Sequence, residues 1–306
     1  MDPHSHKYRE TDSRVICSCG WTAARSQDNF QVWLAHFMSP EFVRSMVSRA
    51  AVRDIVRQFQ NLEHFHWDLE SSGVLQVACG WWAHVNRCAY AIENLYGAGA
   101  VPEATILLRS CLEYALALRA LGDEREEAIL AAQARHAKHS RDLRRDVSGG
   151  PMEKMFELAT KGVELEIGPS GAGWTQKVDG ICRKYGATAT VYMLYRVLCS
   201  ITHPTLTSAD AYFATDEQTG HGTFRRNPTW TFDDDLAFWT CICLVWSWRE
   251  MGKLVKSIDG IELVDRAARE LGIFDLADTS KVGFGTVQLT EARLNEVLFG
   301  HDRMPI

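Results

Sequence analysis

The stretch "PEFVRSMVSRAAVRDIVRQFQNLEHF", residues 40–65, decides the fold class. Its apolar residues recur every three or four positions, as Phe42, Val43, Met46, Val47 and Ala50 illustrate. That spacing puts them on one side of an amphipathic helix, which must bury this side against other elements. Comparable patterns predict helices over about 74–95, from Pro102 onward, and over 123–147, 152–164, 175–184, 187–202 and 232–257. The sequence therefore predicts an all-α fold, a helical bundle.

The overall composition limits the function classes. Hydrophobic residues make up 46% of the chain and charged residues 24%, which is typical of a soluble globular protein. The formal net charge is −6, so contact with nucleic acid needs a local basic patch. No stretch reaches 18 consecutive apolar residues, which predicts a protein without a membrane span.

The cysteines indicate the compartment. There are nine of them, an odd number, and several lie within apolar helical stretches, among them Cys79, Cys88 and Cys111. The polar start of the chain lacks the apolar core of a signal peptide. These features favour reduced thiols and a cytoplasmic protein over a disulfide framework.

The sequence divides into three parts. Residues 1–38 form a small Cys/His module that differs in composition from the rest, and residues 39–260 carry the helical bundle. Residues 261–306 have the pattern of a C-terminal helical tail. Within the bundle, residues 204–230 show no helical period and are expected to be a long loop, which is typical of a lid or binding segment.

The stretch "YRVLCSITHP", residues 195–204, combines an arginine and a histidine at the end of a predicted helix. Helical spacing places Tyr192, Tyr195, Arg196, Cys199 and His203 on one side. Pro204 disfavours helical geometry at His203 and so ends the helix. An imidazole can act as general acid or base near neutral pH, and a guanidinium can bind phosphate.

The Arg-x6-His spacing from Arg196 to His203 in a helical chain resembles the motif of the HEPN superfamily (higher eukaryotes and prokaryotes nucleotide-binding). Many HEPN proteins are metal-independent endoribonucleases of bacterial and phage defence, commonly acting across a dimer of like helices. The resemblance implies a homodimer that binds RNA or a nucleotide. It implies that Arg196 stabilises charge on the phosphorane and that His203 moves a proton. Val197 follows the arginine here, where active members usually have a polar residue.

A second resemblance concerns two helices together. The stretch "LLRSCLEYALALRAL", residues 107–121, followed by "YRVLCSITHP", is similar to uncharacterised bacterial helical proteins. In those proteins an Arg-Ser-x-x-Glu helix precedes a Tyr-x-x-x-Ser-x-x-x-His helix. Glu113 lies in a strongly apolar run, and a buried carboxylate needs a partner. Glu113 is therefore expected either to join Arg196, His203 and Tyr195 in a polar centre or to pair with Arg109 on the helix surface.

The N-terminal module carries a candidate zinc site. The stretch "CSCGW" holds Cys17 and Cys19, His36 lies on a following predicted helix, and either His6 or His4 supplies the fourth ligand. Four Cys and His ligands suit structural zinc. The segment resembles "Cys-x-Cys-Gly-Trp … Trp-x-x-His" segments of actinobacterial and phage-associated proteins. The alternative is a polar start with two free thiols.

A cluster of cations lies around "HAKH", residues 136–139, and argues against a metal site there. In this acidic chain the cluster is the best candidate contact to a phosphate backbone, although a solvated basic face explains it as well. Its members are Arg135, Lys138, Arg141, Arg144 and Arg145.

Three functions remain in competition. The first is a HEPN-like ribonuclease or nucleotide-binding module, with Arg196, His203, Glu113 and Tyr195 as its catalytic residues. The second is a non-catalytic helical interaction or ligand-binding protein in which the same residues form a structural polar core. The third is a metal-dependent enzyme that uses the scattered histidines. The first requires an exposed Arg196 and His203, the second requires them buried, and the third requires three converging ligands.

Overall fold

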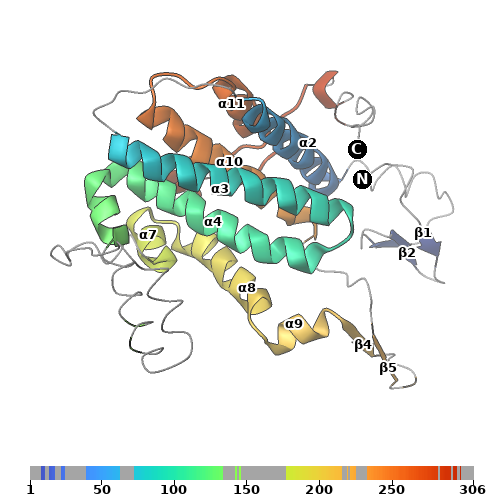
Figure 1. Ribbon diagram of the computed structural model, residues 1–306. Coiled ribbons are helices and arrows are strands. Elements are labelled where there is room, and N and C mark those ends of the chain that lie inside the picture. The colour runs from blue at the N-terminus through green and yellow to red at the C-terminus, as the bar shows by residue number, and fades with distance from the viewer. Residues whose placement is uncertain are drawn as a thin grey trace.

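The computed structural model (Figure 1) describes residues 8–10, 14–17, 22–24, 39–62, 72–133, 142, 145, 177–215, 219, 221–224, 233–281, 283–290, 292–294 and 297. Across these residues the chain is mostly helical, which confirms the all-α class. Two small antiparallel sheets accompany the helices.

The helices follow the predicted order. In chain order they are α2 (Pro40–Gln60), α3 (Ser72–Gly97), α4 (Val101–Glu124), α7 (Val178–Lys184), α8 (Met193–Thr202), α9 (Leu206–Asp210), α10 (Asp233–Leu254) and α11 (Ile261–Glu270). A π-helical turn, η3 (Thr188–Tyr192), leads into α8, and a 3-10 turn, η4 (Leu276–Asp278), follows α11. Residues 126–133, within the predicted helix 123–147, are also helical. The predicted helix 152–164 lies outside the described residues.

Local signals set the helix starts. Ser39 caps α2, and its side chain accepts a hydrogen bond from the Phe42 N–H at 3.2 Å. Proline occupies the first turn of both α2 and α4, where its missing N–H costs nothing. Gly99, between α3 and α4, has a φ of 76°, a left-handed conformation that favours glycine and lets α4 fold back beside α3.

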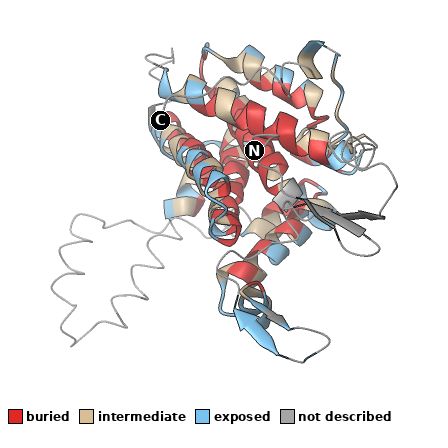
Figure 2. Ribbon diagram, turned by 90° about the vertical axis from the view of Figure 1, so that its right-hand side faces the viewer, coloured by how far each residue is buried: buried red, intermediate tan, exposed pale blue. Residues whose placement is uncertain are grey.

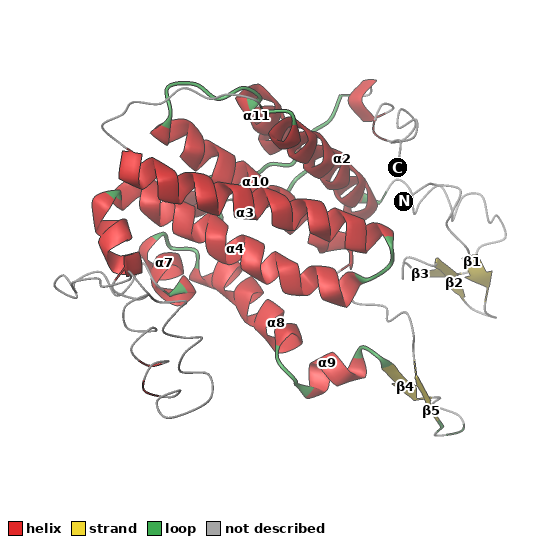
Figure 3. Ribbon diagram, in the orientation of Figure 1, coloured by secondary structure: helices red, strands yellow, loops and turns green. Residues whose placement is uncertain are grey.

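The centre of the bundle is α10. It packs against α2, α3 and α4, and α3 packs along α4 (Figures 1 and 3). Figure 2 shows the buried residues along the inward sides of these helices. Trp248 of α10 is fully buried and lies edge-to-face against Trp82, with ring centroids 4.9 Å apart. Its indole N–H donates to the Asn86 Oδ1 at 3.0 Å, which satisfies the buried polar atom.

The segment predicted as a C-terminal tail begins with α11. This helix packs against α10 and α2 and buries Val264, Ala267 and Ala268. Leu271 and Ile273, directly after it, join the same core. Among the helices of the described residues, none is long and apolar enough to cross a membrane.

The strands occupy two places. At the N-terminus β1 (Tyr8–Glu10), β2 (Arg14–Cys17) and β3 (Thr22–Ala24) form an antiparallel sheet in that order. A hairpin of β4 (Phe213–Thr215) and β5 (Gly222–Phe224) follows α9. The expected long loop 204–230 is therefore wrong in part, because α9 and this hairpin occupy much of it. The missed signal is a capping box, in which Thr205 and Ser208 bond each other's backbone N–H.

Candidate functional site

Helix α8 holds the predicted arginine and histidine at the edge of the bundle. It packs along α4, and its C-terminal end leads out to α9 and the β4–β5 hairpin (Figure 1). Leu194, Leu198 and Ile201 face the core and are buried, whereas Arg196 and His203 are exposed. The apolar side of α8 thus anchors the helix while its polar side stays open to solvent.

The π-helical turn η3 sets the start of this face. The N–H groups of Val191 and Tyr192 both donate to the Ala187 carbonyl oxygen, at 3.0 and 3.3 Å. Such turns are rare and occur often at functional sites. From Tyr192 onward, helical spacing aligns Arg196 and His203 on one side of α8.

A closed polar cluster ties α8 to α4. The Tyr195 hydroxyl donates to the Glu113 Oε1 at 3.0 Å and accepts from the Arg109 Nη2 at 3.4 Å. The Arg109 Nε lies 3.4 Å from the same Glu113 oxygen, and the guanidinium lies over the Tyr195 ring, 5.4 Å from its centroid. We call Arg109, Glu113 and Tyr195 the α4–α8 cluster.

Burial and charge perturb the groups of this cluster. Burial, aided by the Glu113 carboxylate, raises the pKa of Tyr195 to about 12, against the opposing effect of Arg109. Burial on its own would lower the pKa of Arg109, but the Tyr195 hydroxyl and Glu113 outweigh it, so this pKa is raised. The Glu113 side chain remains 37% exposed, so the cluster lies at the surface of the bundle and not in its core.

Replacing Tyr195 by Phe is expected to lower the free energy of unfolding by about 1 kcal/mol, because the hydroxyl leaves two partly buried partners. In the parent protein the folded state keeps the Tyr195 proton up to a pH of about 12, whereas an unfolded tyrosine loses it near 10. The Tyr195 hydroxyl therefore makes its full contribution to the free energy of unfolding below pH ~10, and this contribution is lost as the pH rises toward ~12.

Urea unfolding of both proteins at several pH values from 8 to 11 measures this difference. The stability gap between parent and Tyr195→Phe should narrow above pH ~10. The matched control is Tyr90→Phe, at an exposed tyrosine of α3, which should show no such gap. A difference in the free energy of unfolding between parent and Tyr195→Phe that stays constant with pH would show that the cluster does not raise the pKa of the Tyr195 hydroxyl.

Arg196 differs from most arginines of the bundle. Arg49 and Arg119 form close ion pairs with carboxylates, whereas Arg196 forms no ion pair within the described residues. Its side chain is exposed, and interaction with the Tyr192 hydroxyl raises its pKa. Arg196 thus presents a positive charge to solvent that no neighbouring carboxylate neutralises within the described part of the chain.

His203 is the C-terminal cap of α8. Its N–H donates to the Cys199 carbonyl oxygen at 3.2 Å, and its backbone is extended, with φ −99° and ψ 153°. Its own carbonyl oxygen accepts from the Ser208 Oγ at 3.3 Å. These bonds fix the backbone of His203 between α8 and α9 while leaving the residue exposed.

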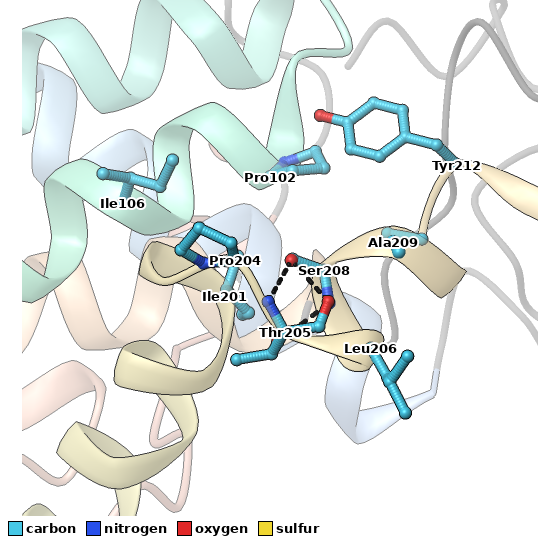
Figure 4. Close-up of a pocket in the computed structure, with 10 residues that line it drawn as sticks. Pro102, Ile106, Ile201, Pro204, Thr205, Leu206, Ser208, Ala209 and Tyr212 are labelled. Atoms are coloured by element: carbon cyan, nitrogen blue, oxygen red, sulfur yellow. Dashed lines mark hydrogen bonds between the residues drawn. The ribbon is translucent and has the colours of Figure 1, made fainter.

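A groove of about 560 Å³ lies directly after His203, between the start of α4 and α9. Figure 4 shows Ile106 and Tyr212 on opposite sides of it and the capping-box bonds between Thr205 and Ser208. The Tyr212 hydroxyl donates to the Glu103 Oε1 at 2.9 Å. The groove has a mainly apolar lining, which includes Pro102, Ile106, Ile201, Pro204, Leu206 and Tyr212.

The structure brings together some of the predicted site residues. Glu113 and Tyr195 are in contact, Arg196 lies exposed on α8, and His203 caps the C-terminal end of that helix. Within the described residues no hydrogen bond or ion pair joins Glu113 to Arg196 or His203. Of the two expected arrangements, the structure shows the pair of Glu113 with Arg109 on α4, which Tyr195 joins from α8.

A second polar group escaped sequence reasoning. The His84 Nε2 lies 3.0 Å from the Ser110 Oγ and 3.3 Å from the Cys88 Sγ, and its ring lies 4.1 Å from that of Tyr114. A single histidine in the apolar stretch "GWWAHVNRC" has no pattern that indicates a partner on α4. Ser110, directly after Arg109, is the only hint that the sequence offers.

The predicted zinc and phosphate contacts fall largely outside the described residues. This applies to Cys19, His36, His6 and His4, and to the basic residues from 135 to 144; Cys17 is described only as the end of β2. Arg145 is exposed and lies 3.7 Å from Asp142. Within the described residues no group of three or more His, Cys, Asp or Glu side chains could hold a metal ion. The zinc site stays a prediction.

The comparisons with known proteins add one finding. Residues 75–221 match a protein family described as a family of unknown function, DUF5677. The match runs from α3 to the β4–β5 hairpin, so it includes the α4–α8 cluster, Arg196, His203 and the groove. No curated protein and no solved structure matches the chain.

Proposed function

We propose that this protein is a metal-independent endoribonuclease of the HEPN type, with Arg196 and His203 as its catalytic residues. The observation that carries the proposal is the exposure of both residues, Arg196 on α8 and His203 at its C-terminal cap. An exposed imidazole and a guanidinium without a carboxylate partner within the described residues suit proton transfer at a phosphodiester whose negative charge needs a cation.

The reaction balances without any further reactant. The ribose 2′-oxygen forms a bond to phosphorus as the bond from phosphorus to the 5′-oxygen breaks, which leaves a 2′,3′-cyclic phosphate. The proton of the 2′-hydroxyl ends on the 5′-oxygen, and His203 carries it. Arg196 stabilises the negative charge that gathers on the non-bridging oxygens in between.

The α4–α8 cluster serves as the support of this site. Tyr195 lies one residue before Arg196 and is held by Glu113 and Arg109 of the neighbouring helix. Catalytic groups need to be held within a few tenths of an ångström, and hydrogen-bonded neighbours supply that restraint. We therefore assign Glu113 and Tyr195 a positioning role.

We further propose that the active form is a homodimer in which α8 faces its counterpart. Met193 and Val197 lie one helical turn apart beside Arg196 and are 56% and 42% exposed, so together they present a small apolar surface. A second copy would cover them and would bring a second Arg196 and His203 near the first pair. The Arg196 of one copy could then act on the same phosphodiester as the His203 of the other.

The competing function is a non-catalytic binding or interaction protein. It is supported by the α4–α8 cluster, whose three members contact one another across the two helices as structural residues do. The competing function does not explain why Arg196 and His203 are exposed, because a structural polar core requires both residues to be buried.

The experiment that tests the proposal is incubation of mixed RNA with the full chain in excess EDTA, with His203→Ala alongside. Cleavage by the wild type that the variant loses, with 2′,3′-cyclic phosphate ends, supports the ribonuclease. A folded wild type that cleaves no RNA under these conditions favours the binding protein instead.

A further inference from the structure

We infer that the groove between α4 and α9 binds one unstacked base of a single-stranded RNA whose phosphate lies at His203. This inference deepens the proposed function and rests on it for the place of the phosphate. It assigns the groove residues a role in selecting single-stranded over double-stranded RNA.

The first support is the position of the groove. Pro204 lines it, and His203 is the preceding residue, so their Cα atoms are only about 3.8 Å apart. A base is joined to its phosphate through a single sugar. A phosphate held by His203 and Arg196 therefore brings the adjoining base to the mouth of the groove.

The second support is the chemistry of the walls. Ile106 and the rings of Pro102 and Pro204 offer apolar surface, and Tyr212 offers an aromatic face (Figure 4). Bases stack on such surfaces irrespective of sequence, as single-strand-binding proteins use them. The volume of about 560 Å³ lies within the range of ligand pockets.

The third support is that Tyr212 is held in place. Its hydroxyl donates to Glu103 of α4, so the ring spans from the α9 side toward α4. The capping box of Thr205 and Ser208 fixes the start of α9 and with it the floor of the groove. A preformed stacking surface loses little entropy when the base enters.

An apolar side chain of a second copy is the alternative occupant. Ile106 is 42% exposed and Leu206 84% exposed, so a protein partner could also cover them. The base is favoured because the groove adjoins the exposed histidine of α8, whereas Met193 and Val197, which flank Arg196, do not line the groove.

The test measures binding separately from cleavage. A labelled single-stranded RNA of about twelve nucleotides, with 2′-O-methyl groups that prevent the proposed cleavage, is titrated with the wild-type full chain, and its fluorescence anisotropy is recorded. Ile106→Trp fills the groove and should weaken binding about 5- to 100-fold, the range of one lost stacking contact. Tyr90→Trp places the same indole at an exposed residue of α3 outside the groove and should change binding less than twofold.

A second pair of variants guards against misfolding. Tyr212→Leu should weaken binding of single-stranded RNA to a similar extent, and Tyr212→Phe, which keeps the ring, should restore it. Binding of a duplex of the same sequence should not differ among the variants, because its bases are already stacked.

Each outcome decides the matter. No binding by the parent, or equal binding by all groove variants, overturns the inference. A loss of self-association in sedimentation with unchanged RNA affinity also overturns it, since a second copy then fills the groove. Groove-dependent binding by a chain whose wild type cleaves no RNA in EDTA supports the base site while rejecting the nuclease. Cleavage by the wild type, together with equal RNA binding by all groove variants, supports the nuclease and rejects the base site.

Discussion

His203→Ala is expected to lower the rate of RNA cleavage in EDTA by about 10²–10⁴-fold, the usual contribution of a general acid or base. His203 is exposed, and its ordered contacts are made by its backbone N–H and carbonyl groups, which alanine retains. The substitution should therefore change the free energy of unfolding by less than about 0.5 kcal/mol. The matched control is His221→Ala, an exposed histidine outside α8, which should retain full activity.

Arg196→Ala is expected to lower the same rate by about 10²–10³-fold, as the loss of one donor to a developing anion does elsewhere. Arg196→Lys keeps the positive charge but loses the planar guanidinium that can bind two phosphate oxygens at once, so it should recover only part of the rate. Arg87→Ala, at an exposed arginine of α3, is the control and should leave the rate unchanged. Equal losses at Arg87 and Arg196 would mean that general positive charge matters and the α8 face does not.

Mixing the two inactive variants tests the homodimer. If Arg196 of one copy works with His203 of the other, a mixed dimer of Arg196→Ala and His203→Ala holds one complete site. Random pairing makes half of the dimers mixed, with one of two sites complete, so about a quarter of the wild-type activity should return. A mixture that stays inactive, with exchange of copies shown by sedimentation, places both residues of each site in one chain.

The helices could be predicted because their information is local. Apolar spacing at Phe42 and Ile55, the cap Ser39 and the proline that ends α8 act within a few residues of where they stand. The segment after Pro204 shows no helical period in the sequence, because α9 is only five residues long. The capping box of α9 is a local signal as well, but without a helical period after it such a signal does not distinguish a short helix from a turn.

The site could be predicted only in part, for a different reason. Helical spacing along one chain segment predicts Tyr192 beside Arg196, and the structure has these two side chains interacting, while His203 ends the helix as its cap. Which residue of α4 meets which residue of α8 depends on how the two helices pack. The sequence alone therefore left the partner of Glu113 open, and the packing gives it Tyr195 and Arg109.

The same limit applies to the most buried charge of the described residues. Glu250 of α10 is 3% exposed in its side chain, and its Oε1 accepts from the Arg119 Nη1 at 2.6 Å and the Lys253 Nζ at 2.7 Å. Arg119 lies 131 residues earlier in the chain. An acidic residue in the apolar stretch "VWSWREMGKLV" predicts that its carboxylate has a partner, but the sequence does not identify the partner.

Glu250→Gln is expected to lower the free energy of unfolding by about 3 kcal/mol, because it removes the charge that balances a partly buried Arg119. Arg119 is only 15% exposed, and its remaining partners are Asp275 at 3.2 Å and Asp123 at 3.7 Å. Neither can bring its charge to the position of the lost one, because the glutamine amide occupies it and Gly122 packs so closely there that a Cβ would stand 2.3 Å from the Glu250 Oε2. Glutamine keeps the volume of glutamate, so the loss reflects charge and not a cavity.

Asp275→Asn is the matched control, because it removes another carboxylate from the same arginine. Asp275 is 42% exposed, so water and Asp123 compensate its loss, and the cost should stay below about 1 kcal/mol. Urea unfolding measures both variants, and Glu250→Gln should shift the midpoint strongly while leaving the slope unchanged. Equal shifts for the two variants would show that burial adds nothing to the Arg119–Glu250 pair, and that the exposed contact of Arg119 with Asp275 stabilises the fold as much as the buried contact with Glu250.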